Sequence, residues 1–380
     1  MKFYDKRLRY INVGKSLSPF YSADLPFFYW SNILLVANPR YGKSAIAKHI
    51  VCEVGQFRKV MIFDYNGEWR KDVLSYNPRS FFPKKLTNVI IVQNMVFKIS
   101  DFTNPQDFIS LGFTPDSAGF LSVCASARSF HHDNVDKLVE LIKDLPTAQS
   151  IKRGFGKNAE YVDCIQEFNN KYAPYGISLD YRIPEATKMS MLKNFFFIQD
   201  WFWKGKKDKR VLYDFNKLWK FYDHIIIDLS SGFGTNENYA QAYVGKILEK
   251  LRPFFHLHKP LFVFEEARFL APRLDMGMGL QPSSLSIIED LATVHPKAGV
   301  AIMLVTQSET MISRRVCEHS TVRLIGTTND GGEPYAIARQ NVRWKPEKNY
   351  RTMIMYHANR TWVHFEPAMP CCNVGGGGGL

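Results

Sequence analysis

Short apolar runs of strand length recur along most of the chain, and several are continuous rather than alternating. Continuous apolar runs are typical of strands that are buried on both faces of a sheet. These runs predict strands over residues 33–37, 60–63, 89–92, 224–229, 261–264, 300–306, 322–326, 352–356 and 362–365.

Apolar residues at helical spacing lie between these runs. Residues 45–54 and 238–251 each place apolar side chains three and four positions apart, which predicts helices with one buried stripe. Strands that alternate with helices indicate an α/β fold with a mainly parallel central sheet.

The stretch over residues 101–222 has a different pattern, because it is poor in strands and is typical of several helices, with 136–145 the clearest. We therefore predict one α/β core in two parts, residues 1–100 and 223–370, with a mostly helical insertion at 101–222 between them. Residues 371–380 contain five consecutive glycines, and this composition predicts a flexible tail.

A phosphate-binding loop is predicted after the first of the buried strands. Residues 37–44 read ANPRYGKS, which has the Walker A spacing with Ala37 in the first glycine position. Such a loop points backbone N–H groups at an anion at the start of a helix. We expect Lys43 to reach the β- and γ-phosphates of ATP and the Ser44 hydroxyl to bind Mg²⁺. The predicted nucleotide-binding residues are Asn38, Pro39, Arg40, Tyr41, Gly42, Lys43, Ser44 and Ala45.

Two adjacent carboxylates follow the apolar run at 261–264, where the acids of a Walker B strand would lie. We assign Glu265 to Mg²⁺ and Glu266 to the general base that prepares the attacking water. The usual metal ligand at the first position is the shorter Asp. An acidic helix N-cap is the structural alternative for this pair. Asp228, which ends the run at 224–228, is the fallback Walker B acid.

Polar side chains at the ends of two other predicted strands are candidates for sensing the γ-phosphate. Gln307 follows the run at 300–306, and Asp64 and Glu68 follow the run at 60–63. A polar group at such a position can report whether the terminal phosphate is present. Ordinary hydrogen bonding within loops is the alternative for all three.

Taken together these segments resemble the HerA/FtsK superfamily of DNA-pumping ATPases, nearer to HerA. The likeness rests on the order and spacing of five pieces: IFDYNGEW at 62–69, ISDFTNPQDFISLGF at 99–113, YDFNKLWKFYDHIIIDLSS at 213–231, LFVFEEARFLAP at 261–272 and GVAIMLVTQS at 299–308. The resemblance implies a RecA-like P-loop NTPase core, a ring that is commonly a hexamer, and ATP-driven movement of double-stranded DNA.

The chain departs from the HerA pattern in three places. Only about 30 residues precede the first strand of the core, Glu265 replaces Asp, and His295-Pro296 stands where HerA proteins have Gly-Arg. The arginine finger therefore cannot be carried over from that position. Arg314, Arg315 and Arg323 are substitutes on chemistry, because a guanidinium from a neighbouring subunit can stabilise the transferring phosphoryl group; ordinary surface charge is the alternative. The predicted catalytic residues are Lys43, Glu266, Gln307, Arg315 and Arg323.

The charge balance favours a polyanionic partner. Lys and Arg number 49 against 36 Asp and Glu, which gives a formal net charge of +13. Nucleic acid is the first expectation and an anionic membrane surface the second. The run KGKKDKR at 204–210 follows the aromatic residues 201–203, a pattern that suits nucleic acid as well as a solvated loop beside core aromatics.

Neither a membrane span nor a signal peptide is predicted from the sequence. The 6 cysteines show no paired C-x-x-C spacing, which speaks against zinc and for free thiols in a reducing cytoplasm. The favoured function is a ring motor that hydrolyses ATP and pumps double-stranded DNA, with a nuclease, capsid or transfer apparatus as further partners. The alternatives are a nucleotide-binding assembly protein with little hydrolysis and an ATPase that acts on protein or at a membrane.

Overall fold

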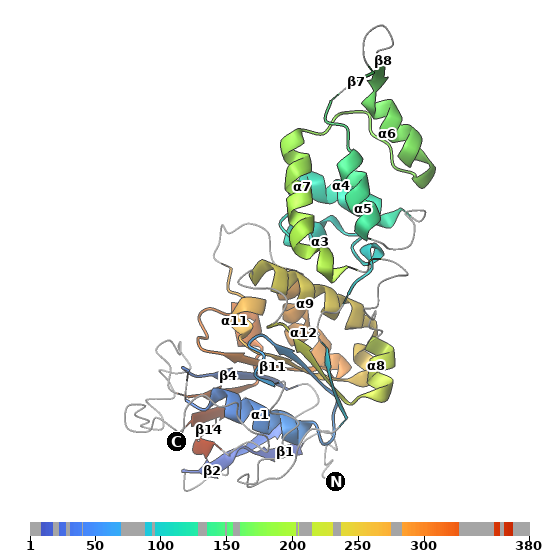
Figure 1. Ribbon diagram of the computed structural model, residues 1–380. Coiled ribbons are helices and arrows are strands. Elements are labelled where there is room, and N and C mark those ends of the chain that lie inside the picture. The colour runs from blue at the N-terminus through green and yellow to red at the C-terminus, as the bar shows by residue number, and fades with distance from the viewer. Residues whose placement is uncertain are drawn as a thin grey trace. The chain divides into compact units, whose positions relative to one another are not determined.

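A single mixed sheet of ten strands forms the centre of the larger part of the molecule (Figure 1). The computed structural model describes residues 9–17, 23–27, 31–39, 41–69, 88–92, 96–127, 135–148, 150–154, 160–202, 204, 215–230, 237–274, 283–326, 353–357 and 361–367. Contacts divide the chain into two compact units, which we call the sheet unit (Met1–Gln93 and Asp214–Leu380) and the helical unit (Asn94–Tyr213). The predicted insertion at 101–222 overlaps the helical unit.

Seven neighbouring strands of the sheet are parallel, in the order β12-β4-β11-β10-β5-β9-β6. Antiparallel β13, β14 and β2 continue the sheet beyond β12. The parallel strands are β4 (Asn32–Val36), β5 (Val60–Asp64), β6 (Val89–Val92), β9 (His224–Asp228), β10 (Leu261–Phe264), β11 (Ala301–Thr306) and β12 (Val322–Ile325). The antiparallel strands are β2 (Gly14–Ser16), β13 (Met353–His357) and β14 (Thr361–Pro367), while β1 (Arg9–Asn12) and β3 (Asp24–Phe27) form a separate antiparallel pair.

Helices cover both faces of the parallel strands. As a result, five of these strands are buried along their whole length: β4, β5, β9, β10 and β11. Helix α1 (Lys43–Val54) packs on one face with a core that includes Ile33, Ile62 and Val263. On the other face Phe63 stacks on Phe264 with ring centroids 5.1 Å apart. Among the described residues, the sheet unit also contains the helices α8 (Phe215–Phe221), α9 (Glu237–Leu251), α10 (Phe255–His258), α11 (Ala267–Leu270), α12 (Ser283–Thr293) and α13 (Arg314–Glu318).

The strand order brings the predicted site residues to one edge of the sheet. Strand β11 lies directly between β4, which precedes the phosphate loop, and β10, which precedes the two glutamates. Because these strands are parallel, their carboxyl ends meet at the same edge, where α/β folds commonly bind ligands. The loop, the acid pair and Gln307 therefore converge from three adjacent strands.

The helical unit packs around aromatic side chains. Phe102 is buried and lies 5.0 Å from Phe202 and 6.0 Å from Phe108, measured between ring centroids. Its helices are α3 (Pro105–Ser110), α4 (Pro115–Ser126), α5 (Val135–Asp144), α6 (Cys164–Tyr172) and α7 (Glu185–Ile198). The sequence pattern missed the antiparallel pair β7 (Ser150–Arg153) and β8 (Glu160–Asp163), whose exposed strands lack an apolar signal.

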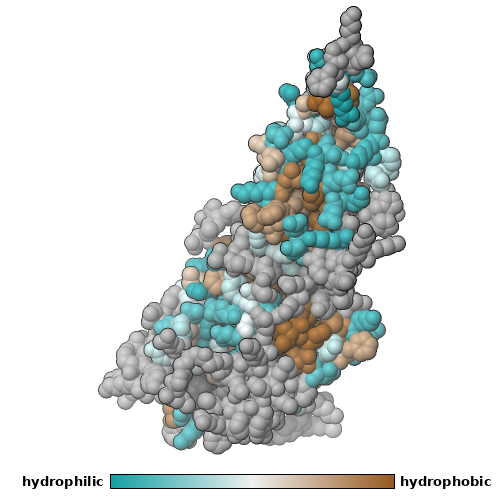
Figure 2. Space-filling model, viewed as in Figure 1, coloured by the Kyte–Doolittle hydropathy of each residue, from teal (hydrophilic) through white to brown (hydrophobic). Residues whose placement is uncertain are grey.

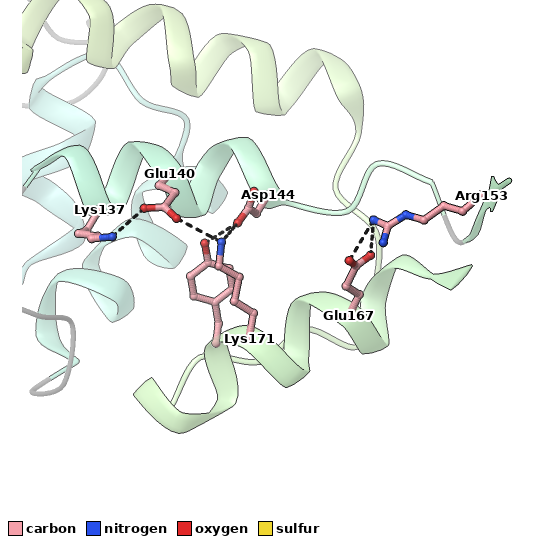
Figure 3. A network of polar contacts seen from close by, with 7 residues as sticks. Lys137, Glu140, Asp144, Arg153, Glu167 and Lys171 are labelled. Atoms are coloured by element: carbon pink, nitrogen blue, oxygen red, sulfur yellow. Dashed lines mark hydrogen bonds and ion pairs between the residues drawn. The ribbon is translucent and has the colours of Figure 1, made fainter. Parts of the chain in front are cut away.

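A network of exposed ion pairs joins α6 to its neighbours in the helical unit (Figure 3). Lys171 contacts Asp144 over 2.6 Å and Glu140 over 3.2 Å, both on α5. Arg153 on β7 contacts Glu167 on α6 over 2.9 Å. Exposed pairs of this kind add little to stability, so the network orients α6 more than it stabilises the fold.

Hydrophilic residues cover much of the visible face of the helical unit, with hydrophobic residues among them (Figure 2). Trp201 and Phe202 are buried, which places these two in the core rather than on a nucleic-acid surface. Lys204 pairs with Asp200 over 3.0 Å; Trp203 and the rest of the basic run lie outside the described residues, as does the predicted tail at 371–380. Within the described part of the chain, every helix is too short or too polar to cross a membrane.

Candidate functional site

The loop between β4 and α1 has the backbone of an anion-binding turn. Gly42 has φ +83°, a left-handed conformation that favours glycine, although a Cβ at this position would meet no atom within 4 Å. Backbone conformation rather than space therefore requires a glycine here. Helix α1 begins at Lys43, and its N-cap residue, Gly42, has no side chain with which to cap the first N–H groups. The N–H groups at such a helix start are the groups that bind an anion such as phosphate in P-loops.

Ala37 stands in the first position of the loop because the residue opposite it is small. Its N–H donates to the Thr306 carbonyl on β11 over 3.2 Å, and the Gly326 N–H donates to the Val36 carbonyl over 2.8 Å. A Cβ added to Gly326 would lie 2.8 Å from the Cβ of Ala37. Because Gly326 has no side chain, the methyl group of Ala37 has the space that it needs at this position. Sequence reasoning identified Ala37 but had no means of pairing it with residue 326.

The two glutamates after β10 lie in the interior of the site. Glu265 is 3% exposed and Glu266 is 5% exposed. Glu266 has φ +47° and precedes α11 in the N-cap position, but its side chain makes no capping hydrogen bond. Glu266 therefore occupies the N-cap position of α11, but its side chain does not cap the helix. The left-handed turn instead directs the carboxylate toward the phosphate loop.

One oxygen of Glu266 contacts two of the predicted catalytic side chains. Lys43 Nζ lies 3.1 Å from Glu266 Oε1, and Gln307 Nε2 donates to the same oxygen over 3.0 Å. The second oxygen, Oε2, lies 3.5 Å from Arg268 Nε. The structure therefore brings together three of the side chains predicted from the sequence, Lys43, Glu266 and Gln307. It adds Arg268, whose signal in the sequence was only a cation two residues after the acid pair.

Glu265 has a different partner. Its Oε1 accepts a hydrogen bond of 2.9 Å from the indole N–H of Trp69, which is completely buried. Burial raises the pKa of Glu265 to about 7, and the positive charge of Lys43 is the largest influence that lowers it. Trp69 was not among the predicted site residues. The only sequence signal was its place at the end of the IFDYNGEW segment.

Asp64 organises the turn that carries Trp69. Its carboxylate accepts the N–H groups of Glu68 over 3.1 Å and Trp69 over 2.9 Å. Burial raises the pKa of Asp64 to about 6, and the nearby Asp228 raises it further, whereas the backbone N–H groups lower it. Loop hydrogen bonding is thus what Asp64 does in this structure.

The residues at this edge fit a magnesium ion that travels with nucleotide. Among the described residues, no group of three or more His, Cys, Asp or Glu side chains could hold a metal ion alone. Mg²⁺ commonly takes one or two protein oxygens, with phosphate and water completing its shell. The half-buried Ser44 at the start of α1 and the Glu265 carboxylate offer such oxygens. These two side chains would hold the ion, which supplies charge neutralisation to the phosphates when it is bound.

The three arginines considered for a finger each have an acidic partner in their own chain. Arg323 on β12 pairs with Glu309 over 2.5 Å and donates to the Cys317 carbonyl over 2.9 Å. Arg315 lies 3.5 Å from Glu289 and is half exposed. Arg314 is 80% exposed in its side chain and pairs with Glu318. Arg314 and Arg315 therefore lie at the surface, whereas Arg323 is engaged in a largely buried pair.

Asp228, the fallback acid, lies at the end of β9. Strands β11, β10 and β5 separate β9 from β4 in the sheet. Its carboxylate accepts the N–H of Ser230 over 3.0 Å and the Ser230 hydroxyl over 2.7 Å. Its position favours Glu265 and Glu266 as the acids nearest the phosphate loop. Of the predicted nucleotide-binding residues, only Arg40 lies outside the described part of the chain.

Comparison with solved structures identifies the fold. VirB4 of Thermoanaerobacter pseudethanolicus aligns with 14% identity over 93% of this chain and 95% of its own, with a TM-score of 0.52. The bacterial conjugative coupling protein TrwB aligns with 10% identity over 90% of this chain and 86% of its own, with a TM-score of 0.55. The chain has the RecA-like P-loop NTPase fold. No family model matches the sequence, and a search of curated proteins gave no match.

Both structures share with this chain the P-loop NTPase fold that the sequence resemblance implied. The genome packaging NTPase B204 from Sulfolobus turreted icosahedral virus 2, solved with ATP-gammaS, also aligns, with 9% identity over 89% of this chain and 98% of its own and a TM-score of 0.39. The P-loop NTPase fold explains why the loop after β4 and the acids after β10 face each other across β11.

Proposed function

We propose that this protein is an ATPase that works as a ring motor, most simply a hexamer, and moves double-stranded DNA. The observation that carries the proposal is the contact of Lys43 and Gln307 with the same oxygen of Glu266. These three side chains come from three different segments of the chain. Their convergence gives a phosphate ligand, a base and a sensing amide within one hydrogen-bonded group.

Each member of the group has a part in phosphoryl transfer. In the proposed reaction Lys43 donates to the β- and γ-phosphate oxygens, and Glu266 accepts a proton from the attacking water. Gln307 orients the carboxylate and, on its other side, reports the terminal phosphate. Burial of Glu265 and Glu266 keeps bulk water away, so that charge interactions inside the site are stronger than in water.

In this proposal the phosphate oxygens of the nucleotide compete with Glu266 for the ammonium group of Lys43. Once Lys43 turns to the phosphates, Glu266 keeps the Gln307 amide on Oε1 and Arg268 near Oε2. The base is then oriented but no longer paired with the lysine, so that nucleotide binding itself readies the carboxylate for water.

The movement of DNA and the assembly into a ring are supported by the net charge, by a structural likeness and by two exposed arginines. The net charge of +13 suits a polyanion. TrwB, with the same fold, is a conjugative coupling protein, and its likeness supports a DNA-transfer role for this chain as a proposal. Arg314 and Arg315 are exposed enough to act on a neighbouring subunit in a ring.

Steady-state phosphate release tests the proposal. Wild type, Glu266→Gln and Glu249→Gln are compared with ATP and Mg²⁺, each with and without duplex DNA. Glu249 is the matched control because it is an exposed glutamate of α9 that pairs with Lys246. We expect Glu266→Gln to lower kcat by about 100-fold or more and Glu249→Gln to match wild type.

Two outcomes separate the competing functions. Equal phosphate release by wild type and Glu266→Gln, with nucleotide still bound, would leave a nucleotide-binding assembly protein as the function. Turnover that duplex DNA does not change, together with DNA binding that does not weaken as salt rises, would remove DNA as the track. Particle images with an ATP analogue and duplex report the number of subunits in the assembly.

A further inference from the structure

Trp69 is held in place from several directions at the base of the site. Asp64 binds the backbone N–H of Trp69, and the fully buried Lys48 of α1 donates to the Glu68 carbonyl over 3.2 Å. The Lys48 ammonium also lies 5.7 Å from the centre of the Trp69 ring. A side chain fixed in this way has little freedom to choose another hydrogen-bond acceptor.

The indole N–H of Trp69 is directed at one oxygen of the longer acid. It donates to Glu265 Oε1 over 2.9 Å, and both side chains are buried. Glu265 has one more methylene than the Asp usual at this position, and therefore one more rotatable bond. A fixed donor on one carboxylate oxygen removes that freedom, because rotation would leave both buried groups without the bond.

We propose that Trp69 is the positioning residue that orients Glu265 toward the metal–nucleotide complex. This inference rests on the proposed ATPase function. Trp69 touches neither phosphate nor metal in this role and acts through Glu265 alone. Hydrogen-bond partners of metal ligands commonly matter for affinity, because they fix the ligand that binds the ion. Helix α1 then serves both ends of the site, with Lys43 in the phosphate loop and Lys48 behind Trp69.

The chain offers a matched control for the N–H group. Trp219 is also buried, 1% exposed, and its indole nitrogen has no hydrogen-bond partner among the described residues. Trp→Phe at either position removes a similar ring volume and one N–H. Only at position 69 does the change remove a hydrogen bond to a carboxylate of the site.

Binding of Mn²⁺, a spectroscopic substitute for Mg²⁺, tests the inference without relying on turnover. The full chain is titrated with Mn²⁺ at a saturating concentration of a non-hydrolysable ATP analogue, and free Mn²⁺ is measured by electron paramagnetic resonance. We expect Trp69→Phe to weaken Mn²⁺ binding by about 10-fold and Trp219→Phe to leave it unchanged. Binding of the analogue in EDTA should be the same in all three proteins.

The partner carboxylate gives a second arm. In a Glu265→Gln background, Trp69→Phe should cause no further loss of Mn²⁺ affinity, because the residue acts through Glu265. Wild-type affinity in Trp69→Phe, or an undiminished additional loss in the Glu265→Gln background, would overturn the inference while leaving the ATPase intact. A wild type that binds neither Mn²⁺ nor nucleotide would overturn the proposed function as well.

A measurement on folded protein covers the case in which Trp69→Phe does not fold. The chain has 7 tryptophans, and their indole N–H signals can be observed by NMR after ¹⁵N-tryptophan labelling. Glu265→Gln should move one indole signal, and that signal should differ from the one that disappears in Trp219→Phe. A spectrum in which Glu265→Gln moves no indole signal would contradict the hydrogen bond on which the inference depends.

Discussion

Lys43 and Glu266 form a buried ion pair across the site, with Nζ 3.1 Å from Oε1 and side-chain exposures of 8% and 7%. The pair joins the first residue of α1 to the acid that follows β10. Charges buried to this degree are costly unless they are matched, so each residue depends on the other for its counter-charge. Nucleotide binding must therefore replace a protein contact and not simply add one.

Replacing the lysine of this pair tests both its roles. We expect Lys43→Met to weaken ATP binding by about 10- to 100-fold, because a charge-assisted contact with phosphate is lost. It should also lower the free energy of unfolding by about 3 kcal/mol, because Glu266 stays buried without its main counter-charge. Nucleotide titration and urea unfolding measure the two effects. Lys246→Met is the control, since Lys246 is also buried but its partner Glu249 is exposed.

Gln307 contributes through the same oxygen of Glu266 and should affect turnover more than binding. We expect Gln307→Ala to lower kcat by about 10-fold with little change in nucleotide affinity, because the base loses one orienting donor. Gln307→Glu should be worse, since it places a second carboxylate beside Glu266. Single-turnover hydrolysis and equilibrium binding separate the two steps. An exposed control, Gln56→Glu, should behave as wild type.

The pairing of Ala37 with Gly326 predicts a compensating double substitution. Gly326→Ala should destabilise the protein by about 1–3 kcal/mol, because its Cβ would lie 2.8 Å from that of Ala37. Adding Ala37→Gly should recover a large part of the loss, because it removes the opposing methyl group. Thermal unfolding of the single and double variants gives the coupling. Equal destabilisation in the presence and absence of Ala37→Gly would assign the strain to Met353, whose Cε lies 3.2 Å from the added Cβ.

The fold could be predicted from the sequence because its strands are continuous apolar runs separated by helical spacing. The predicted strand at 60–63 and the observed β5, Val60–Asp64, differ by one residue. The strands β7 and β8 could not be found in this way, because they are exposed and their sequences carry no apolar signal. Local pattern thus identifies strands that the sheet buries on both sides and misses those that stay at the surface.

Sequence motifs identified part of the site, whereas its other residues became visible only through contacts between segments that are distant in the sequence. Lys43 and Glu266 follow a strand in a recognisable motif, so their meeting could be expected. The contacts of Trp69 with Glu265 and of Gly326 with Ala37 join segments about 200 and 300 residues apart. Neither contact leaves a periodic or motif signal, because a buried tryptophan and a glycine are common in any core.

The arginines proposed for trans action should separate into one structural residue, Arg323, and two exposed candidates, Arg314 and Arg315. Arg323→Ala should lower the free energy of unfolding by about 3–5 kcal/mol, because it leaves Glu309 in a largely buried position without its ion-pair partner. Arg315→Ala should cost less than about 1 kcal/mol. If Arg315 acts on a neighbouring subunit, mixing Arg315→Ala with Lys43→Met protein should restore ATPase activity. No recovery in mixed assemblies that are shown to form would exclude Arg315 from that role.

His224 predicts a specific loss of stability on acidification. It is 2% exposed at the start of β9, and burial lowers its pKa to about 4, with Lys59 lowering it further. Asp223 and the Gly55 backbone oppose the shift only in part. The unfolded chain, with an ordinary pKa of 6.5 for this residue, binds more protons than the folded chain between pH 6.5 and 4. The contribution of neutral His224 to the free energy of unfolding is therefore fully present above pH 6.5 and is lost as the pH falls toward 4.

The loss should reach about 3 kcal/mol at pH 4, because the shift is roughly 2.5 units at 1.36 kcal/mol each. Asp64 and Glu265 act in the opposite direction, since their raised pKa values of about 6 and about 7 make the folded state bind extra protons in the same pH range. These effects offset that of His224 in the wild-type profile, so a difference measurement is needed. Urea unfolding from pH 7.5 to 4.5 should show wild type losing stability relative to His224→Gln. The exposed His256→Gln variant should follow wild type throughout, and parallel curves for wild type and His224→Gln would show that His224 is not buried in its neutral form.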